Sequence, residues 1–186
     1  MNQTTQNSSA AVEILDAEAI RRALRRIAHE IVENNRELKS VMLAGIPSRG
    51  VELARRIAEA IRAVAKIDID TGVIDVAMHR DDIGSRAELP AVRVSKLPML
   101  LEGHTVIIVD DVLYTGRTVR AAMDAISSFG RPARIQLAAL IDRGHRELPI
   151  RADYVGKNLP TAATDKIRVR LEQTDNQPDA VWLVKP

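Results

Sequence analysis

Two adjacent carboxylates, Asp110 and Asp111, are the residues of this chain best suited to chemistry on a sugar. They close an apolar run, Val106 to Val109, and precede a short loop, Thr115 to Thr118, that contains Gly116. A carboxylate pair can accept hydrogen bonds from two vicinal hydroxyls, such as those of a ribose. Backbone N–H groups at the start of a helix bind phosphate, and threonine hydroxyls add further donors. This order of residues predicts a pocket for a sugar phosphate.

The elements around these residues must place the carboxylates beside the loop. The β-branched run predicts a strand buried on both faces, and the alanine-rich segment Val119 to Ser128 predicts a helix after the loop. Taken singly, the carboxylates would end a strand and the loop would be an ordinary turn. In this order they resemble the phosphoribosyl-pyrophosphate (PRPP) motif of type I phosphoribosyltransferases. The resemblance implies that PRPP or UMP contacts Asp110, Asp111, Val112, Leu113, Tyr114, Thr115, Gly116, Arg117 and Thr118.

Composition sets limits on the class of protein. The chain has 186 residues, of which 46% are hydrophobic and 28% charged, as expected for one soluble globular domain. We expect a disordered tail over residues 1–11 and a single domain over residues 12–186. The absence of cysteine excludes disulfides, thiol catalysis and cysteine-bound metals. No apolar run reaches membrane-spanning length and no signal peptide is visible, which favours a cytoplasmic protein.

Strand and helix patterns alternate along the chain. Helices are predicted from Asp16, as the N-cap, to Asn34 and over Val51–Ala65. Strands are predicted over Val41–Ile46, Val73–Met78, Val106–Val109, Arg134–Ile141, Tyr154–Val155, Ile167–Leu171 and Ala180–Val184. This alternation predicts an α/β fold with a doubly wound, mainly parallel sheet, whose ligand site lies at the carboxyl ends of the strands. The resemblance adds a small hood and a flexible lid loop.

A second anion-binding loop is predicted at Ser48, Arg49 and Gly50, between a strand and a helix. Its N–H groups and the guanidinium could hold a pyrophosphate. By itself this segment would be a surface turn, and only its combination with the acidic motif favours the ligand site. The loop resembles the pyrophosphate loop of the transferases, which implies a non-proline cis peptide; we place that bond between Ser48 and Arg49.

The irregular stretch from His79 to Gly103 is either a solvated charged segment or a lid. As a lid, it would exclude water from the oxocarbenium-like centre that forms when ribose C1 leaves pyrophosphate. Arg80 would then reach the pyrophosphate as a catalytic residue together with Asp110 and Asp111, and Asp81 or Asp82 would support Mg²⁺. Magnesium binds largely through substrate phosphates, so no dense carboxylate cage is expected.

A basic stretch from Asp142 to Asn158 is not required by sugar-phosphate chemistry, and alone it would be a solvated loop. Together with Ile20–Glu30 and Gly116–Asp124 it resembles the bifunctional pyrimidine operon regulators, the PyrR family. That resemblance covers residues 12 to 157. It implies an RNA-binding face made of Arg25, Arg26, His29, Arg146, Arg151 and Lys157, where Arg25 adds a charge to the family pattern. We expect uracil transfer to be independent of Arg146 and Arg151.

The resemblance implies a uracil phosphoribosyltransferase that converts uracil and PRPP, with Mg²⁺, to UMP and pyrophosphate. It also implies UMP-dependent binding of the pyrimidine operon leader mRNA, and a homodimer or higher homo-oligomer. The residues leave alternatives open: a purine or orotate phosphoribosyltransferase without RNA binding, or an RNA-binding regulator whose pocket only senses nucleotide. The uracil contacts and the level of control, transcription or translation, are not specified by the sequence.

Overall fold

The computed structural model describes residues 11–79, 97 and 101–186. At its centre lies a five-stranded sheet with the order β3-β2-β4-β5-β6, in which every neighbouring pair is parallel. All five carboxyl ends therefore meet at one edge of the sheet. The strands are β2 (Val41–Gly45), β3 (Asp70–Val73), β4 (Thr105–Leu113), β5 (Arg134–Asp142) and β6 (Tyr154–Asn158).

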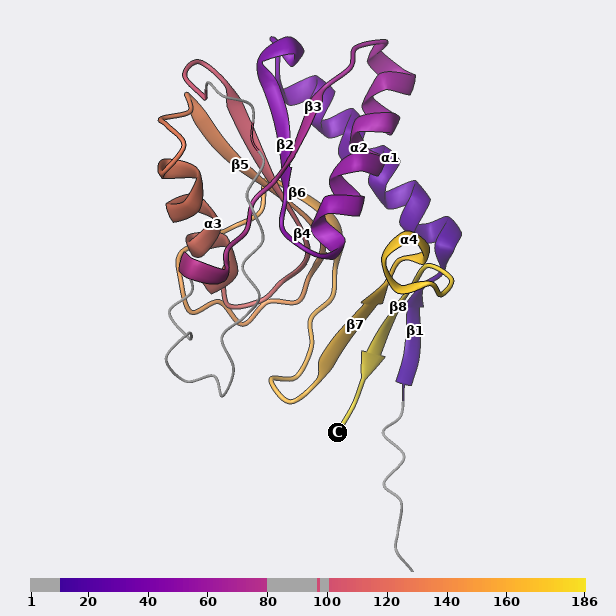
Figure 1. Ribbon diagram of the computed structural model, residues 1–186. Helices are drawn as coiled ribbons and strands as arrows, with labels where there is room; N and C mark the ends of the chain where they lie inside the picture. Colours follow the sequence, from indigo (N-terminus) through magenta and orange to yellow (C-terminus); the bar gives the residue numbers. More distant parts are fainter. Residues whose placement is uncertain (1–10, 80–96, 98–100) are drawn as a thin grey trace, which may run out of the picture.

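Helices cover both faces of this sheet (Figure 1). One face carries α1 (Ala17–Asn34) and α2 (Arg49–Ala65), and the other carries α3 (Arg117–Ser127) with the short 3-10 helix η2 (Ala77–His79). Another 3-10 turn, η1 (Leu38–Ser40), leads into β2. Because side chains alternate along a strand, Ile107 and Val109 enter the core under α1 and α2, whereas Val106 and Ile108 enter the core under α3. The apolar run of β4 is thus buried on both faces, as predicted.

A second, antiparallel sheet lies beside the first and is called the hood here (Figure 1). It has the order β1-β8-β7 and contains β1 (Ala11–Leu15), β7 (Lys166–Arg170) and β8 (Ala180–Val184). A four-residue helix, α4 (Glu172–Asp175), connects β7 to β8. Val169, Leu171 and Val181 of this part pack into the core beneath α1 and α2. The hood is therefore fixed to the sheet domain by apolar contacts.

Two predicted strands, β3 and β4, have the wrong boundaries, and β6 also continues to Asn158, three residues past its predicted end. β3 occupies 70–73 instead of 73–78, because residues 70–73 pair with residues 42–45 of β2. The Asp75 Oδ1 atom accepts a hydrogen bond from the Ala77 N–H and starts η2 there. β4 also continues past Asp110 and Asp111, since Val112 and Leu113 still pair with β5. The acidic pair is thus followed by two more residues of the strand and does not close it.

Ala11, which the sequence assigns to the N-terminal tail, opens β1, where it pairs with Val184 of β8. The rest of the predicted tail, residues 1–10, lies outside the described residues. The N-cap prediction is confirmed, because the Asp16 Oδ1 atom accepts a hydrogen bond of 2.7 Å from the Ala19 N–H. Across the described part of the chain, no helix has the length and apolar character needed to span a bilayer.

Candidate active site

Asp110 and Asp111 lie near the carboxyl end of β4, the central strand of the sheet. Asp110 is buried and Asp111 is half-buried. Each carboxylate accepts a hydrogen bond of 2.9 Å from the next backbone N–H along the chain, which fixes its orientation. Burial raises the pKa of Asp111, and the positive charge of Arg49 opposes this effect. The strand therefore presents two fixed carboxylates at the edge where ligands bind in such sheets.

The predicted phosphate loop follows directly and opens α3. Gly116 has φ of +92°, a conformation that other residues rarely adopt, and α3 begins at the next residue, Arg117. The helix starts two residues earlier than predicted, so Arg117 and Thr118 both belong to its first turn. The Thr115 Oγ1 atom accepts a long hydrogen bond of 3.4 Å from the Arg117 N–H. The loop thus directs the first N–H groups of α3 toward the strand end, as a phosphate site requires.

The loop after β5 holds this phosphate loop in place. The Thr115 carbonyl accepts hydrogen bonds from the N–H groups of Glu147, at 3.0 Å, and Leu148, at 3.2 Å. Arg146 donates to the Tyr114 carbonyl at 2.8 Å and also to the Gly144 and Ile150 carbonyls. The Arg146 guanidinium thus spans the two loops, a contact that the sequence did not predict.

The loop of Ser48, Arg49 and Gly50 packs against the acidic pair. A Cβ atom on Gly50 would lie 2.3 Å from the Val109 carbonyl oxygen, so only glycine allows this approach of α2 to β4. The Arg49 Nη1 atom lies 3.9 Å from the Asp111 Oδ2 atom. A non-proline cis peptide is present, but it joins Pro47 to Ser48; the predicted position, one bond later, is wrong. Because α2 begins at Arg49, the next bond is part of the helix entry.

On the other side of β4, an open pocket of about 440 Å³ lies between the loop after β5 and the segment after β6. Arg143 is buried there, with its guanidinium carbon 4.2 Å from the centre of the Tyr114 ring. It donates to the Thr161 Oγ1 atom and the Ala162 carbonyl. Sequence reasoning assigned this segment to RNA and missed the pocket. The signal was available, because Arg143 follows β5 at the same sheet edge as Asp111.

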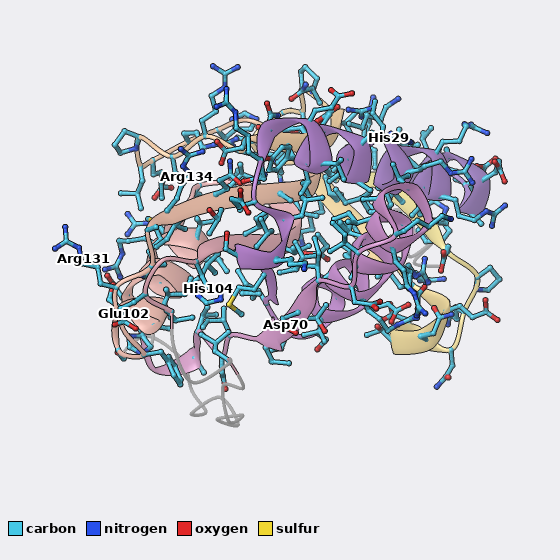
Figure 2. The ribbon with its side chains drawn as sticks, turned by 90° about the horizontal axis from the view of Figure 1, so that it is seen from above. His29, Asp70, Glu102, His104, Arg131 and Arg134 are labelled. Atoms are coloured by element: carbon cyan, nitrogen blue, oxygen red, sulfur yellow. The ribbon has the colours of Figure 1, made fainter. Side chains whose placement is uncertain are left out.

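The six residues predicted to bind RNA do not form one cluster. Arg26 donates to the carbonyls of Val155 and Gly156, which places it beside β6 and near the exposed Lys157. His29 is exposed on the next turn of α1, where Figure 2 labels it. Arg25 instead lines a groove between α1 and α2. Arg151 is exposed. The guanidinium of Arg146 donates to the Tyr114 carbonyl and so connects the two loops.

Two further arginines, Arg131 and Arg134, lie away from the residues predicted to bind RNA. Arg131 and Arg134 lie with Glu102 and His104 at one end of the molecule, far from His29 (Figure 2). The structure therefore supports a smaller basic surface made of Arg26, His29 and Lys157, and we call it the α1–β6 surface.

The residues predicted to bind metal and to form the lid cannot be placed in the site. Arg80, Asp81 and Asp82 lie outside the described residues. Within the described ranges, no three histidine or acidic side chains form a group that could hold a metal ion. The first residue of the predicted lid, His79, ends η2, and its carbonyl accepts a hydrogen bond from Arg120 of α3.

Comparison with known proteins places this arrangement in a family. Residues 10–173 match the phosphoribosyl transferase domain family. The chain is 54% identical over 173 residues to a protein of Roseiflexus sp. and 58% identical over 171 residues to one of Chloroflexus aurantiacus, both named bifunctional protein PyrR. These alignments cover 93% and 92% of this chain and 94% of each relative.

Solved structures show the same fold. A hypoxanthine phosphoribosyltransferase from Staphylococcus aureus superposes with a TM-score of 0.70 over 100% of this chain and 98% of its own, at 19% identity. The enzyme of Trypanosoma cruzi in complex with IMP gives 0.72 over 97% and 96%, also at 19% identity. At this identity the likeness concerns the fold alone. The family resemblance of the sequence is confirmed: this chain belongs to the PyrR family of type I phosphoribosyltransferases.

Proposed function

We propose that this chain transfers the phosphoribosyl group of PRPP to uracil, and that it binds pyrimidine operon leader mRNA in a UMP-dependent way. The observation that carries the transferase assignment is the order of three sites along the sheet edge. Arg49 follows β2, the acidic pair lies near the carboxyl end of β4, and the pocket of Arg143 follows β5 and β6. A pyrophosphate, a ribose and a base can therefore lie in line.

Each part of the substrate has a chemical counterpart in this order. The Asp110 and Asp111 carboxylates accept the ribose hydroxyls, and the N–H groups that open α3 hold the 5′-phosphate. Arg49 faces the pyrophosphate that departs. Magnesium, which family members use with PRPP, would neutralise the pyrophosphate and bind mainly through its oxygens. Catalysis then consists of alignment and charge stabilisation, with no covalent nucleophile on the protein.

The base is assigned to the pocket beside Arg143. Arg143 and its neighbours after β5 form one wall, while residues 158–161 after β6 form the other. The Arg143 guanidinium is held by Thr161 and Ala162, so its position is fixed before a ligand arrives. A fixed donor beside backbone polar groups can read the carbonyl and imide groups of a pyrimidine.

The transferase assignment is tested by product analysis with Mg²⁺, PRPP and single bases. Uracil should give UMP, whereas hypoxanthine, guanine and orotate should give essentially no nucleotide. The variant Asp111→Asn serves as the control for a site-dependent reaction. Preferred use of a purine would reject uracil as the substrate, and absence of any transfer by a protein that binds UMP would favour a nucleotide sensor.

The regulatory assignment is tested by gel-shift titration of a pyrimidine leader transcript with and without UMP. UMP should tighten RNA binding, and by linkage RNA should tighten UMP binding by the same factor. Structured RNA with loop or bulge bases offers the sequence readout, so a scrambled hairpin is the control. Weak RNA binding that is unchanged by UMP and equal for the scrambled hairpin would show that the protein is an enzyme with a basic surface and not a regulator. The homo-oligomer stays a prediction, which analytical ultracentrifugation measures.

A further inference from the structure

Arg49 is held by a carboxylate from the hood. Its Nε atom donates to Asp175 Oδ2 at 3.0 Å and its Nη2 atom donates to Asp175 Oδ1 at 2.7 Å. The side edge of the guanidinium is therefore used by a bidentate pair, the strong geometry for an arginine and a carboxylate. The remaining Nη1 atom is directed to the strand end, 3.9 Å from Asp111 Oδ2.

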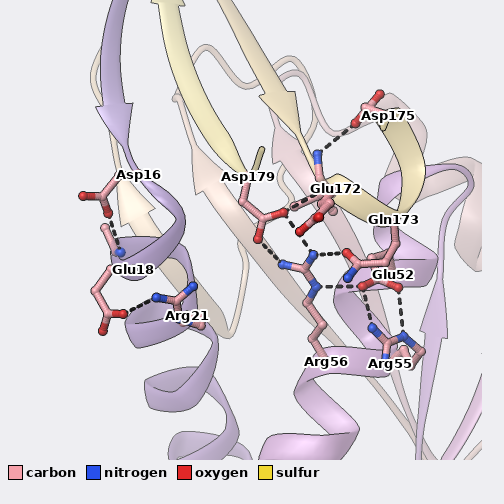
Figure 3. Close-up of polar contacts among 12 residues, drawn as sticks. Asp16, Glu18, Arg21, Glu52, Arg55, Arg56, Glu172, Gln173, Asp175 and Asp179 are labelled. Carbon is pink, nitrogen blue, oxygen red and sulfur yellow. Dashed lines mark hydrogen bonds and ion pairs between the residues drawn. The ribbon is translucent and has the colours of Figure 1, made fainter. Parts of the chain in front are cut away.

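Asp175 is itself fixed independently of Arg49. Its Oδ2 atom also accepts a hydrogen bond of 2.9 Å from the Leu171 N–H, across the single turn of α4. Figure 3 shows this contact as the dashed line from Asp175 to a backbone nitrogen. The hydrogen bond from Arg49 holds the pKa of Asp175 below its ordinary value. The carboxylate is thus a charged, preformed anchor at neutral pH.

We propose that Asp175 is a positioning residue for the pyrophosphate group. Its carboxylate accepts hydrogen bonds from the Nε and Nη2 atoms of Arg49. This pair orients the Nη1 atom toward the position that the pyrophosphate of PRPP would occupy. Without these hydrogen bonds the Arg49 side chain would populate many rotamers, and the loss of this conformational entropy would weaken ligand binding. The inference rests on the proposed function, because it assigns a task within PRPP binding. It names a residue of the hood, 126 positions from Arg49 in the chain.

A purely structural role of this segment can be separated from the positioning role. Asp179, four residues after Asp175, also accepts hydrogen bonds from α2, but from Arg56, at 3.1 Å to Oδ1. Asp179 Oδ1 also accepts from the Glu172 N–H at 2.8 Å. Figure 3 shows Arg56 bonded to Asp179, Gln173 and Glu52. Asp179 therefore fastens the same hood segment to the same helix without contact to Arg49, and it is the matched control.

The test compares Asp175→Asn with Asp179→Asn in calorimetric titrations of PRPP with Mg²⁺, of pyrophosphate with Mg²⁺, and of UMP. The asparagine at 175 can still accept from Leu171 N–H but cannot form the bidentate pair. Asp175→Asn should bind PRPP and pyrophosphate about tenfold more weakly, as expected for one lost orienting ion pair. It should bind UMP as the wild type does, since UMP has no pyrophosphate, and KM for PRPP should rise more than kcat falls.

Asp179→Asn should lower the melting temperature and leave the ratio of PRPP affinity to UMP affinity at the wild-type value. If Asp175→Asn loses UMP and PRPP affinity equally, Asp175 is only a structural anchor and the inference is overturned. If its PRPP and pyrophosphate affinities stay at the wild-type value, the inference is also overturned. If the wild-type protein binds neither PRPP nor pyrophosphate, the proposed function itself fails, and the two failures are thereby distinguished.

Discussion

The guanidinium of Arg146 donates a hydrogen bond of 2.8 Å to the carbonyl oxygen of Tyr114, the residue just before the phosphate loop. The same guanidinium is paired with the carboxylate of Asp142 at the end of β5. A residue that the family pattern places on an RNA-binding face therefore connects the loop after β5 to the predicted phosphate loop. Any ligand that moves the phosphate loop must also act on the loop of Arg146.

Replacing Arg146 tests this connection. Arg146→Gln removes the ion pair with Asp142 and leaves several carbonyls without their donor, at a cost of about 1–3 kcal/mol in the free energy of unfolding. We expect a lower melting temperature and weaker UMP binding. Arg151→Gln, which changes an exposed residue of the same stretch, should alter neither. Equal UMP affinity for both variants in calorimetry would show that the loop does not support the site.

The acidic pair should control PRPP use. Asp110→Asn or Asp111→Asn replaces a carboxylate with an amide that cannot accept from both ribose hydroxyls. One lost charge-assisted hydrogen bond is worth about 1.5–3 kcal/mol, or roughly one to two decades in kcat/KM for PRPP. Steady-state kinetics with varied PRPP measures this loss. A change confined to KM for uracil would contradict a ribose role.

The pH dependence should report Asp111. Burial raises the pKa of its carboxyl, so the ionised form is lost at a higher pH than for an ordinary aspartate as the solution is acidified. Because kcat/KM reports the free enzyme, its acid limb for PRPP should lie above the ordinary aspartate range. Arg49→Met removes the charge that opposes this rise and should move the limb to still higher pH. Arg55→Met, on the same helix, should leave the position of the limb unchanged.

The α1–β6 surface should determine the salt dependence of RNA binding. Lys157→Gln should weaken binding and reduce the slope of log affinity against log salt by about one, because one fewer counterion is released. Arg26→Gln should do the same and also lower the melting temperature, since Arg26 bonds the β6 carbonyls. Arg131→Gln, at the distant end in Figure 2, is the control. A larger effect from Arg131 would relocate the RNA site.

Local patterns allowed the motif to be predicted. The buried run of β4, the acidic pair and Gly116 lie within a few residues of each other, so strand, loop and helix follow from neighbouring side chains. Asp175 could not be found in this way, because its partner Arg49 is distant in sequence and the two meet only through the packing of the hood. The strand β1 was missed because its first three residues are exposed and show no alternation.

Charged side chains were the other source of error. Arg146 and Lys157 have equal weight in a count of basic residues, yet one donates to backbone carbonyls and the other is exposed. A sequence shows the charge of an arginine but not which carbonyl oxygens the fold brings within reach of it. The structure therefore assigns Arg146 to the loops at the strand ends and Lys157 to the α1–β6 surface, a division that the sequence alone does not show.

The hood joins the two ends of the described chain: β8 is its last strand in sequence and its middle strand in space, with β1 on one side (Figure 1). During synthesis on the ribosome, β1 emerges early but cannot pair until its partner strand β8, residues 180–184, has been made. The parallel sheet and its phosphate loop can form first, whereas the segment that carries Asp175 is secured only when β8 arrives. We therefore expect the nascent protein to form the predicted ribose and phosphate contacts before Asp175 fixes Arg49.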